Sequence, residues 1–321
     1  MSKMRLLIAA LTCSFLLSCG CSADRYIPVD AETYLIKSGD KVLLGYQHKP
    51  MTNPKGGEKF KGSNFIHPLN TPSGFTLTDL QPSDHLHHFG LWWPWKFLKV
   101  EGRKLNCWEL QQGQGLIQAQ GLLNSPVTTK ELKSFLAESH YIDRTAPDGP
   151  KVVLKETLIV TVSPIVQTPA NGYYLDMRII QSPAVDTPVE VVKYRYSGFS
   201  IRGTAKWNKT NSTLLTSQGK DRNSSNYSRG NWVLAQGDTD TDTKAGFLMM
   251  SHPSNPDTPQ NLRTWNDKMY NGTTFINFNP VQKKSWILQP GKKYTQKYRL
   301  FVYDGTINKD QAEKIWQDFV K

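Results

Sequence analysis

Apolar and polar residues alternate along most of this chain with the two-residue period of a β-strand. Leu175, Met177 and Ile179 alternate with polar neighbours, which predicts a strand that buries one face. Further strands are predicted at residues 158–162, 189–196, 231–236, 245–250 and 298–302. Turn pairs such as Asn171-Gly172 separate the runs. The pattern predicts an all-β protein with mainly antiparallel pairing, because such short turns cannot make the long crossovers of a parallel sheet.

One segment has the period of an α-helix, and it lies at the C-terminal end of the chain. Asn308 is placed to cap it, and Gln311 stands three residues later, as a capping box requires. The apolar stripe of this helix contains Ala312, Ile315, Trp316 and Phe319. We expect the helix to close the edge of a sheet. Together with the closely spaced strands, it predicts a large antiparallel β-sandwich with a short C-terminal helix, and the absence of an internal repeat argues against a propeller.

The first residues predict export. Lys3 and Arg5 precede an apolar run, residues 6–17, that is too short to span a bilayer and is typical of a secretory signal. The run ends in Leu-Leu-Ser-Cys, which fits a bacterial lipoprotein box with Cys19 as the lipidated residue; the alternative is an ordinary cleaved signal with an incidental cysteine. We expect a signal peptide at 1–18, a lipoprotein tether at 19–25 and a single β-sandwich domain at 26–321. The expected location is the bacterial cell envelope, lipid-anchored or periplasmic or secreted, with membrane contact only through the N-terminal lipid.

The composition narrows the function classes. The formal net charge of +12 favours anionic partners, but the lysines are scattered and no nucleic-acid motif accompanies them, so we expect no nucleic-acid partner. Of the four cysteines, Cys107 alone lies in the predicted domain, which excludes a disulfide within it and a multi-cysteine metal site. The absence of a Walker loop, dinucleotide fingerprint, G-x-S-x-G elbow and H-E-x-x-H motif disfavours kinases, dehydrogenases, the usual serine esterases and zincins.

The strongest candidate for chemistry is the run Asp84-His85-Leu86-His87-His88, which holds three of the seven histidines. If the run is extended, His85 and His87 share a face and His88 points the other way. Two imidazoles on one face bind a metal or divide acid and base duties, and a nearby carboxylate fixes a tautomer. We therefore expect His85 and His87 to act as catalytic acid and base or to bind a divalent metal, with His88 in support. Candidates for a third metal ligand are His67, His140 and His252.

Other segments add candidate residues. Glu109 follows a Cys-Trp pair and can serve as an acid or base, and His252 follows an apolar strand, with Arg263 and Trp265 further on, which suits a polar ring-shaped ligand. Arg195 and Arg202 are placed to clamp an anionic group. We expect Glu109 and His252 to join the catalytic pair. The expected substrate-binding residues are His67, Asp84, His88, Trp92, Arg202, Asn255, Arg263, Trp265 and Asn279.

These motifs resemble the signature of the PmoA-like family, a bacterial domain of unknown function often labelled "methane oxygenase". The most specific match is Asp84-His85-x-His87-His88-x-Gly90-Leu91-Trp92. The remaining matches follow in order over residues 40–320, at 65–69, 108–109, 198–202, 252–256, 265, 279–280, 298–300 and 304–305. The chain departs from the family pattern at Leu86, where proline is usual, at Phe89, where arginine is usual, and at Asn64-Phe65, where Arg-Pro is usual.

The resemblance implies a fold rather than a reaction. A methane-oxidising membrane subunit needs several transmembrane helices, and no segment after the predicted signal is long and apolar enough to form one. The β-rich pattern is similar to the galactose-mutarotase-like supersandwich, which hosts mutarotases, polysaccharide lyases and some glycosidases. In that fold a histidine often works with a carboxylate or tyrosine on the concave sheet face.

The sequence predicts an exported carbohydrate-active enzyme, a lyase, epimerase or glycoside hydrolase, that uses a histidine-centred site. Nine Trp and thirteen Tyr fit this, because aromatic faces stack on sugar rings. Hydrolysis by two carboxylates needs a close pair, and Asp84 and Glu109 are the obvious acids. The alternatives are a metal-dependent envelope enzyme of other chemistry and a non-catalytic glycan-binding lipoprotein. The expected partner is a carbohydrate or another polar small molecule, with an anionic group as an option, and a divalent metal is the candidate cofactor.

Overall fold

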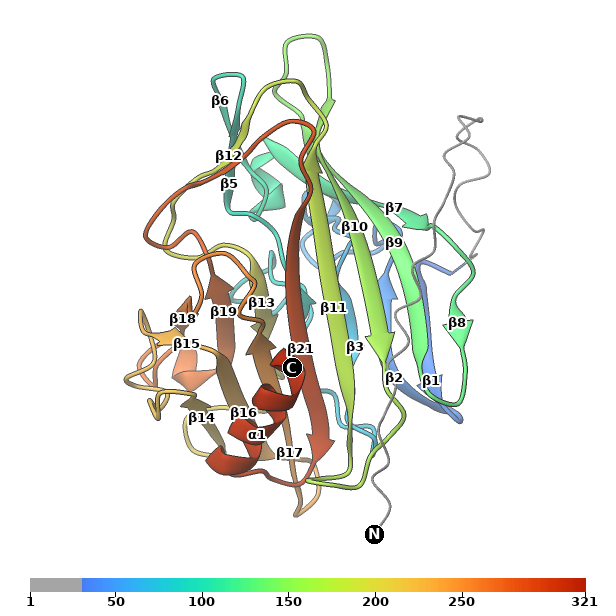
Figure 1. Cartoon of the computed structure of the whole chain (residues 1–321), viewed down its shortest axis with the longest axis vertical. Coiled ribbons are helices and arrows are strands. Elements are labelled where there is room, and N and C mark those ends of the chain that lie inside the picture. Colours follow the sequence, from blue (N-terminus) through green and yellow to red (C-terminus); the bar gives the residue numbers. More distant parts are fainter. Residues whose placement is uncertain (1–30) are drawn as a thin grey trace.

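Two large antiparallel sheets pack face to face in the computed structural model, which describes residues 31–321 (Figure 1). The predicted signal peptide, Cys19 and the tether lie outside the described residues. The first sheet has eight strands, in the order β1 (Thr33–Ser38), β2 (Lys41–Gln47), β3 (Ile66–Leu69), β4 (Leu91–Trp92), β13 (Phe199–Arg202), β19 (Phe275–Asn279), β18 (Gln260–Thr264) and β15 (Arg229–Gly230). Adjacent strands in this sheet all pair antiparallel.

The second sheet has nine strands and is built mainly from long hairpins. Its order is β14 (Ser212–Thr216), β16 (Trp232–Asp238), β17 (Lys244–Ser251), β21 (Tyr294–Asp304), β11 (Gly172–Pro183), β10 (Lys151–Val162), β9 (Lys133–Asp143) and β7 (Gly115–Leu122), with β8 (Val127–Thr128) paired to β9. The long strands run side by side in Figure 1. The predicted all-β antiparallel sandwich is thus confirmed.

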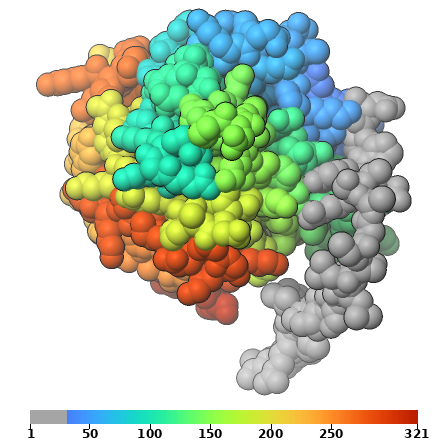
Figure 2. Space-filling view, turned by 90° about the horizontal axis from the view of Figure 1, so that it is seen from above, coloured from blue at the N-terminus to red at the C-terminus, as the bar shows by residue number. Residues whose placement is uncertain are grey.

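A third, four-stranded sheet covers one end of the sandwich. It contains β20 (Trp286–Leu288), β12 (Val189–Val191), β5 (Phe97–Val100) and β6 (Arg103–Asn106). Figure 2 looks down on this end, where teal, yellow and orange-red segments from distant parts of the chain meet. Beneath it, Leu98, Val191 and Leu288 pack against Tyr141 and Val153 of the nine-stranded sheet and form a second core. The predicted strand 189–196 ends at Val191, so the residues after it are free to form a loop.

The main core lies between the two large sheets and follows the alternation of their strands. Leu91, Ile201 and Ile276 are buried in it from the eight-stranded sheet, and Val160 and Leu300 are buried in it from the nine-stranded sheet. Since neighbouring residues on a strand point to opposite faces, each of these strands presents its other residues to the outside of the sandwich. On the eight-stranded sheet, that outer face carries the polar and aromatic residues described below.

The C-terminal helix α1 (Lys309–Val320) begins at Asn308 with the predicted capping box, in which the side chains of Asn308 and Gln311 bond each other's backbone N–H. Ala312 and Ile315 are buried against Leu248 and Phe301, on the outer face of the nine-stranded sheet. The expectation that the helix closes a sheet edge is therefore wrong: it covers a face, because β16, β17 and β21 are apolar on both sides. No helix within residues 31–321 combines the length and apolar character that crossing a membrane requires.

Candidate functional site

A row of outward-facing side chains crosses the eight-stranded sheet. Trp92 on β4 lies opposite Ser200 on β13, Ser200 lies opposite Asn277 on β19, and Asn277 lies opposite Arg263 on β18. Phe275 belongs to the same outer face, two residues before Asn277 on β19. The four strands therefore form a base for the loops at residues 79–90, 106–112, 192–197 and 265–274.

The histidine run forms tight turns, not an extended strand. The backbone N–H of His85 donates to the carbonyl of Pro82 at 3.0 Å, and that of His88 donates to the carbonyl of His85 at 2.9 Å. The expectation that His88 points away from His85 and His87 is therefore wrong, because pleat geometry does not apply to turns. One ring nitrogen from each of the three histidines lies within 4.8 Å of the other two, and the three form the one such group of metal-ligating side chains in residues 31–321.

Aromatic packing fixes the innermost histidine. His88 is buried, and its ring stacks on His85 at 4.5 Å and on Phe275 at 5.2 Å between ring centres. Burial lowers the pKa of His88 well below its usual value, and it lowers that of His87 to about 4. It also lowers the pKa of His85, although the neighbouring Asp84 opposes this. All three imidazoles are thus neutral at physiological pH, which is the form that binds metals.

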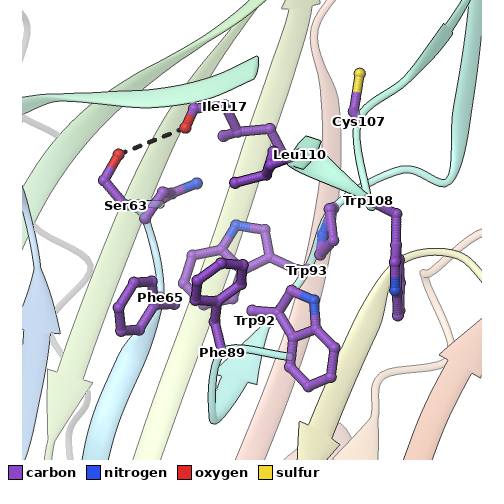
Figure 3. Close-up of a pocket in the computed structure, with 11 residues that line it drawn as sticks. Ser63, Phe65, Phe89, Trp92, Trp93, Cys107, Trp108, Leu110 and Ile117 are labelled. Atoms are coloured by element: carbon purple, nitrogen blue, oxygen red, sulfur yellow. Dashed lines mark hydrogen bonds between the residues drawn. The ribbon is translucent and has the colours of Figure 1, made fainter. Parts of the chain in front are cut away.

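The aromatic residues beneath the histidines form a packed floor. The rings of Phe65 and Phe89 lie 5.1 Å apart, and those of Trp92 and Trp108 lie 5.3 Å apart (Figure 3). A cavity of only about 20 Å³ remains among them, which is about the space of one water molecule. Phe65 and Phe89, two positions at which the sequence departs from the PmoA-like pattern, therefore pack on each other as part of this floor.

Residue 90 ends the histidine loop, and its backbone conformation and close contacts allow only glycine there. Its φ is +66°, and a Cβ built there would lie 2.6 Å from the carbonyl oxygen of Ile66 on β3. The Gly90 carbonyl accepts from Arg202 N–H, and the Asp79 N–H donates to the Arg202 carbonyl, so both ends of the loop are bonded to β13. The close approach brings the three histidines down onto the sheet.

Gly90→Ala is expected to lower the free energy of unfolding by about 3 kcal/mol, since it adds both a left-handed alanine and a clash with backbone. Gly102→Ala is the matched control, because Gly102 has φ +81° but nothing within 4 Å of its Cβ position. It is expected to cost about 1 kcal/mol. Chemical denaturation measures both variants, and equal losses would contradict the close approach at Gly90.

An ion pair between the buried Arg202 and the more exposed Asp84 lies beside His85. Arg202 Nη2 donates to both oxygens of Asp84, at 3.0 and 2.8 Å, and Asp84 Oδ2 lies 3.6 Å from His85 Nδ1. The Arg202 guanidinium is buried, 4.6 Å from the centre of the Trp265 ring. The Asp84 carboxylate thus lies near His85 Nδ1, at a distance longer than a hydrogen bond, in the place that the outer partner of a metal-binding histidine occupies. Asp84 and Arg202 are positioning residues: they line a neighbouring depression, not the histidine pocket.

The three histidines open into a polar pocket of about 390 Å³, a size suited to a small-molecule ligand. Its walls come from all four loops and from the sheet. Its lining residues are His85, His87, His88, Trp108, Glu109, Arg195, Tyr196, Arg263, Trp265, Met269, Tyr270 and Phe275. The predicted residues Glu109, Arg263 and Trp265 are thus brought to the histidines.

Glu109 is held rigidly by donors. Its Oε2 pairs with Lys96 Nζ at 2.7 Å and accepts from the side chain of Asn106 at 2.9 Å, while its Oε1 accepts from Tyr196 OH at 3.1 Å. Burial raises the pKa of Glu109, but the hydrogen bonds from Lys96 and Asn106 outweigh it and leave that pKa below its usual value. The carboxylate is therefore ionised at neutral pH, suited to accept a proton or a hydrogen bond and unsuited to act as an acid.

Several predicted residues do not reach this pocket. His252 lies just after β17 of the other sheet, where its Nδ1 bonds Ser254 and its ring contacts Phe319 of α1 at 5.3 Å. Asn255 ties the same turn to β21 through the backbone of Lys297. Asn279 bonds the carbonyl of Tyr194 and the N–H of Val281, which fixes a loop. The expected grouping of His252 with the catalytic histidines is thus wrong, because it is carried by a different sheet.

The expected third metal ligand is also different. His67 on β3 points to the outer face, but its Nδ1 bonds Thr78 Oγ1 at 2.9 Å, and it does not line the pocket. His140 lies on β9 of the other sheet, with Nε2 2.9 Å from Glu138 Oε1. His88 completes the group instead. Trp92 is present as expected but lies in the floor, 4.9 Å from His88, where it supports the site.

Sequence reasoning missed Lys96 and Tyr270. Lys96 is buried and holds Glu109, and a signal for it existed: a lone lysine at the end of the aromatic run 92–95 needs a partner for its charge. Tyr270 contacts His85 at 4.8 Å between ring centres, from a short helical turn, η4 (Tyr270–Gly272). No sequence pattern indicates it, because a loop path places it there.

Fold and site together define a large antiparallel β-sandwich protein with a three-histidine pocket on the outer face of one sheet. The model of a family of unknown function, DUF6807, matches residues 33–317, so the chain belongs to that family. This match does not test the resemblance to the PmoA-like family. The sequence has no match among curated proteins.

Solved structures with a similar arrangement include three enzymes. Heparan sulfate lyase HepC from Pedobacter heparinus has 10% identity and a TM-score of 0.38, over 83% of this chain and 33% of that one. The GH36 alpha-galactosidase AgaA from Geobacillus stearothermophilus has 10% identity and a TM-score of 0.36, over 84% and 39%. A galactose mutarotase related enzyme from Lactobacillus acidophilus has 13% identity and a TM-score of 0.31, over 66% and 79%. The chain thus spans less than half of the lyase and of the galactosidase, and the fold assignment rests on the topology described above.

Proposed function

We propose that this protein is a carbohydrate-active enzyme that depends on a divalent metal bound by His85, His87 and His88. The observation that carries the proposal is the convergence of three neutral imidazoles at the base of a polar pocket. Three histidines with an open position are a common ligand set of catalytic zinc. Such a metal acts as a Lewis acid toward a substrate oxygen.

The geometry fits this ligand set after small movements. Two nitrogens on one tetrahedral zinc ion lie roughly 3.4 Å apart, so a separation of 4.8 Å must close by about 1.4 Å. His85 and His87 are only half-buried and can rotate, whereas His88 is fixed by its stacking. Nδ1 of His88 is buried and has no hydrogen-bond partner among the described residues, and a metal is one way to satisfy an imidazole in that position.

The walls of the pocket support a sugar as the substrate. Trp265, Tyr270 and Tyr196 offer aromatic faces, and the polar side chains between them offer donors and an acceptor for hydroxyl groups. Of the described lining residues, Glu109 is the one carboxylate. Hydrolysis by two opposed carboxylates is therefore disfavoured, and a lyase or epimerase reaction, in which Glu109 accepts a proton, is favoured.

Metal analysis of protein purified without a histidine tag tests the proposal. We expect about one zinc, manganese or other divalent transition metal per chain, and turnover on a panel of glycans that a chelator abolishes and the metal restores. His140→Ala is the matched control, since His140 lies on the other sheet and should leave the metal content unchanged. Full turnover by a metal-free preparation would overturn the proposed metal dependence. Sugar binding without any product would point to a glycan-binding protein instead.

A further inference from the structure

Two arginines face the histidine pocket without an acidic partner. Arg195 and Arg263 both line the pocket, and neither guanidinium is paired with a carboxylate in the part of the chain that the structure describes. The other cations beside the pocket are paired with acids: Lys96 with Glu109, and Arg202 with Asp84. The pocket therefore has an excess of positive charge before any metal is added.

The surroundings of Arg263 hold its charge in place without neutralising it. Its Nη1 donates to the amide oxygen of Asn226 at 2.9 Å, and its guanidinium lies 5.6 Å from the ring centre of Tyr227. Burial lowers the pKa of Arg263, and the positive charge of Arg195 lowers it further. The two positive charges repel each other, and an anion bound between them would stabilise both charged side chains.

Arg195 approaches from the loop that follows β12. Its guanidinium is exposed and lies 5.5 Å from the ring centre of Tyr196. A neutral sugar that fills the pocket would shield both guanidiniums from water and give them no countercharge, which is unfavourable. An anionic group accepts charge-assisted hydrogen bonds from both, and guanidinium forks match carboxylate and sulfate oxygens.

We propose that the substrate of this pocket is an acidic sugar, with its carboxylate or sulfate group bound between Arg195 and Arg263 and its ring directed toward the three histidines. This inference rests on the proposed function for the identity of the site and adds the class of substrate. Glu109 lines the same pocket and can accept a proton from a sugar whose acidic group is held by the arginines and whose ring reaches the histidines.

Matched pairs of sugars test the inference by calorimetric titration of the protein loaded with zinc. The pairs are glucuronate with glucose, galacturonate with galactose, and glucose 6-sulfate with glucose. We expect at least one acidic member to bind about tenfold or more tightly than its neutral counterpart. The uronate and sulfate pairs tell which acidic group is recognised.

Arg263→Met identifies the residue responsible, since methionine keeps much of the apolar stem and removes the charge. It is expected to weaken binding of the acidic sugar by about tenfold or more and to leave the neutral sugar within about twofold. Arg178→Met, an exposed arginine on β11 of the other sheet, is the control and should change neither. The inference is overturned if no acidic sugar binds more tightly than its neutral counterpart, or if none of the sugars binds at all. An equal loss for both members of a pair in Arg263→Met also overturns it.

Zinc content measured on the same samples separates this inference from the proposed function. If the protein binds no metal and still prefers acidic sugars, the proposed acidic substrate is supported and the proposed metal is rejected. If the protein binds zinc but shows no preference for acidic sugars, the metal is supported and the acidic substrate is rejected. Arg195→Met should lose the preference while it retains zinc, because Arg195 is not one of the three proposed metal ligands.

Discussion

Replacement of His88 by alanine is expected to weaken divalent metal binding at least a hundredfold. Loss of an outer-shell partner of a metal ligand already costs ten- to a hundredfold in affinity, and loss of a ligand costs more. The effect should match that of His87→Ala, because the three ring nitrogens lie within 4.8 Å of one another. An extended strand would instead direct His88 away from the other two, and His88→Ala would then leave the metal bound. Isothermal titration with zinc decides between the two geometries.

A second substitution guards against unfolding. His88 is buried between His85, Trp92 and Phe275, so alanine also leaves a hole. His88→Phe preserves the stacked ring and removes both nitrogens. It should fold with nearly the original stability and still fail to bind zinc. If His88→Phe binds zinc like the original protein, His88 is a packing residue and the proposed ligand set is wrong.

The fold could be predicted because strand periodicity is a local property. The alternation at 175–179 and 298–302 places one face of β11 and β21 in the core, as found. The capping residues of α1 could be predicted for the same reason. Its packing could not: whether a helix covers an edge or a face depends on residues such as Leu248 and Phe301, whose outer position is set by the whole sheet.

The candidate site was predictable only as far as its residues are neighbours in sequence. The density of histidines at 85–88 drew attention to the right loop, but its conformation was misjudged. Pro82 and Gly90, which flank the run, are turn residues that argued against a strand. His252 was expected in the site because Arg263 and Trp265 follow it in the sequence, yet order along a chain does not say which sheet carries a residue.

Glu156→Gln is expected to lower the free energy of unfolding by about 3 kcal/mol, because Glu156 ties the two large sheets together beneath the site. Glu156 lies on β10, is buried, and accepts from Trp93 Nε1 at 2.7 Å, Asn64 Nδ2 at 2.8 Å and Gln181 Nε2 at 2.6 Å. Asn64 and Trp93 stand beside β3 and β4 of the opposite sheet. An amide must turn its NH₂ group toward at least one of these donors, which leaves that donor unsatisfied.

The pH dependence of this loss follows from the same burial. Burial raises the pKa of Glu156, and the hydrogen bonds from Trp93, Asn64 and Gln181 oppose the rise only in part. A carboxyl group with a raised pKa in the folded state loses stability as the pH increases from its unfolded value of about 4.3 through its folded value. The advantage of the original protein over Glu156→Gln should therefore be largest near pH 4 and decrease toward neutral pH. Histidine protonation is common to both proteins and cancels in the difference.

Urea denaturation of both proteins between pH 4 and pH 8 measures this difference directly. Glu190→Gln on β12 is the matched control, a half-buried glutamate for which a change within about 0.5 kcal/mol is expected. A difference that grows with pH would mean that the donors favour the ionised carboxylate, and that hydrogen bonding outweighs burial at Glu156.

The Glu156→Gln substitution should also reduce zinc affinity, because Trp93, which bonds Glu156, is adjacent to Trp92 in the floor of the pocket. That reduction should be smaller than the loss caused by His88→Phe, since no ligand is removed.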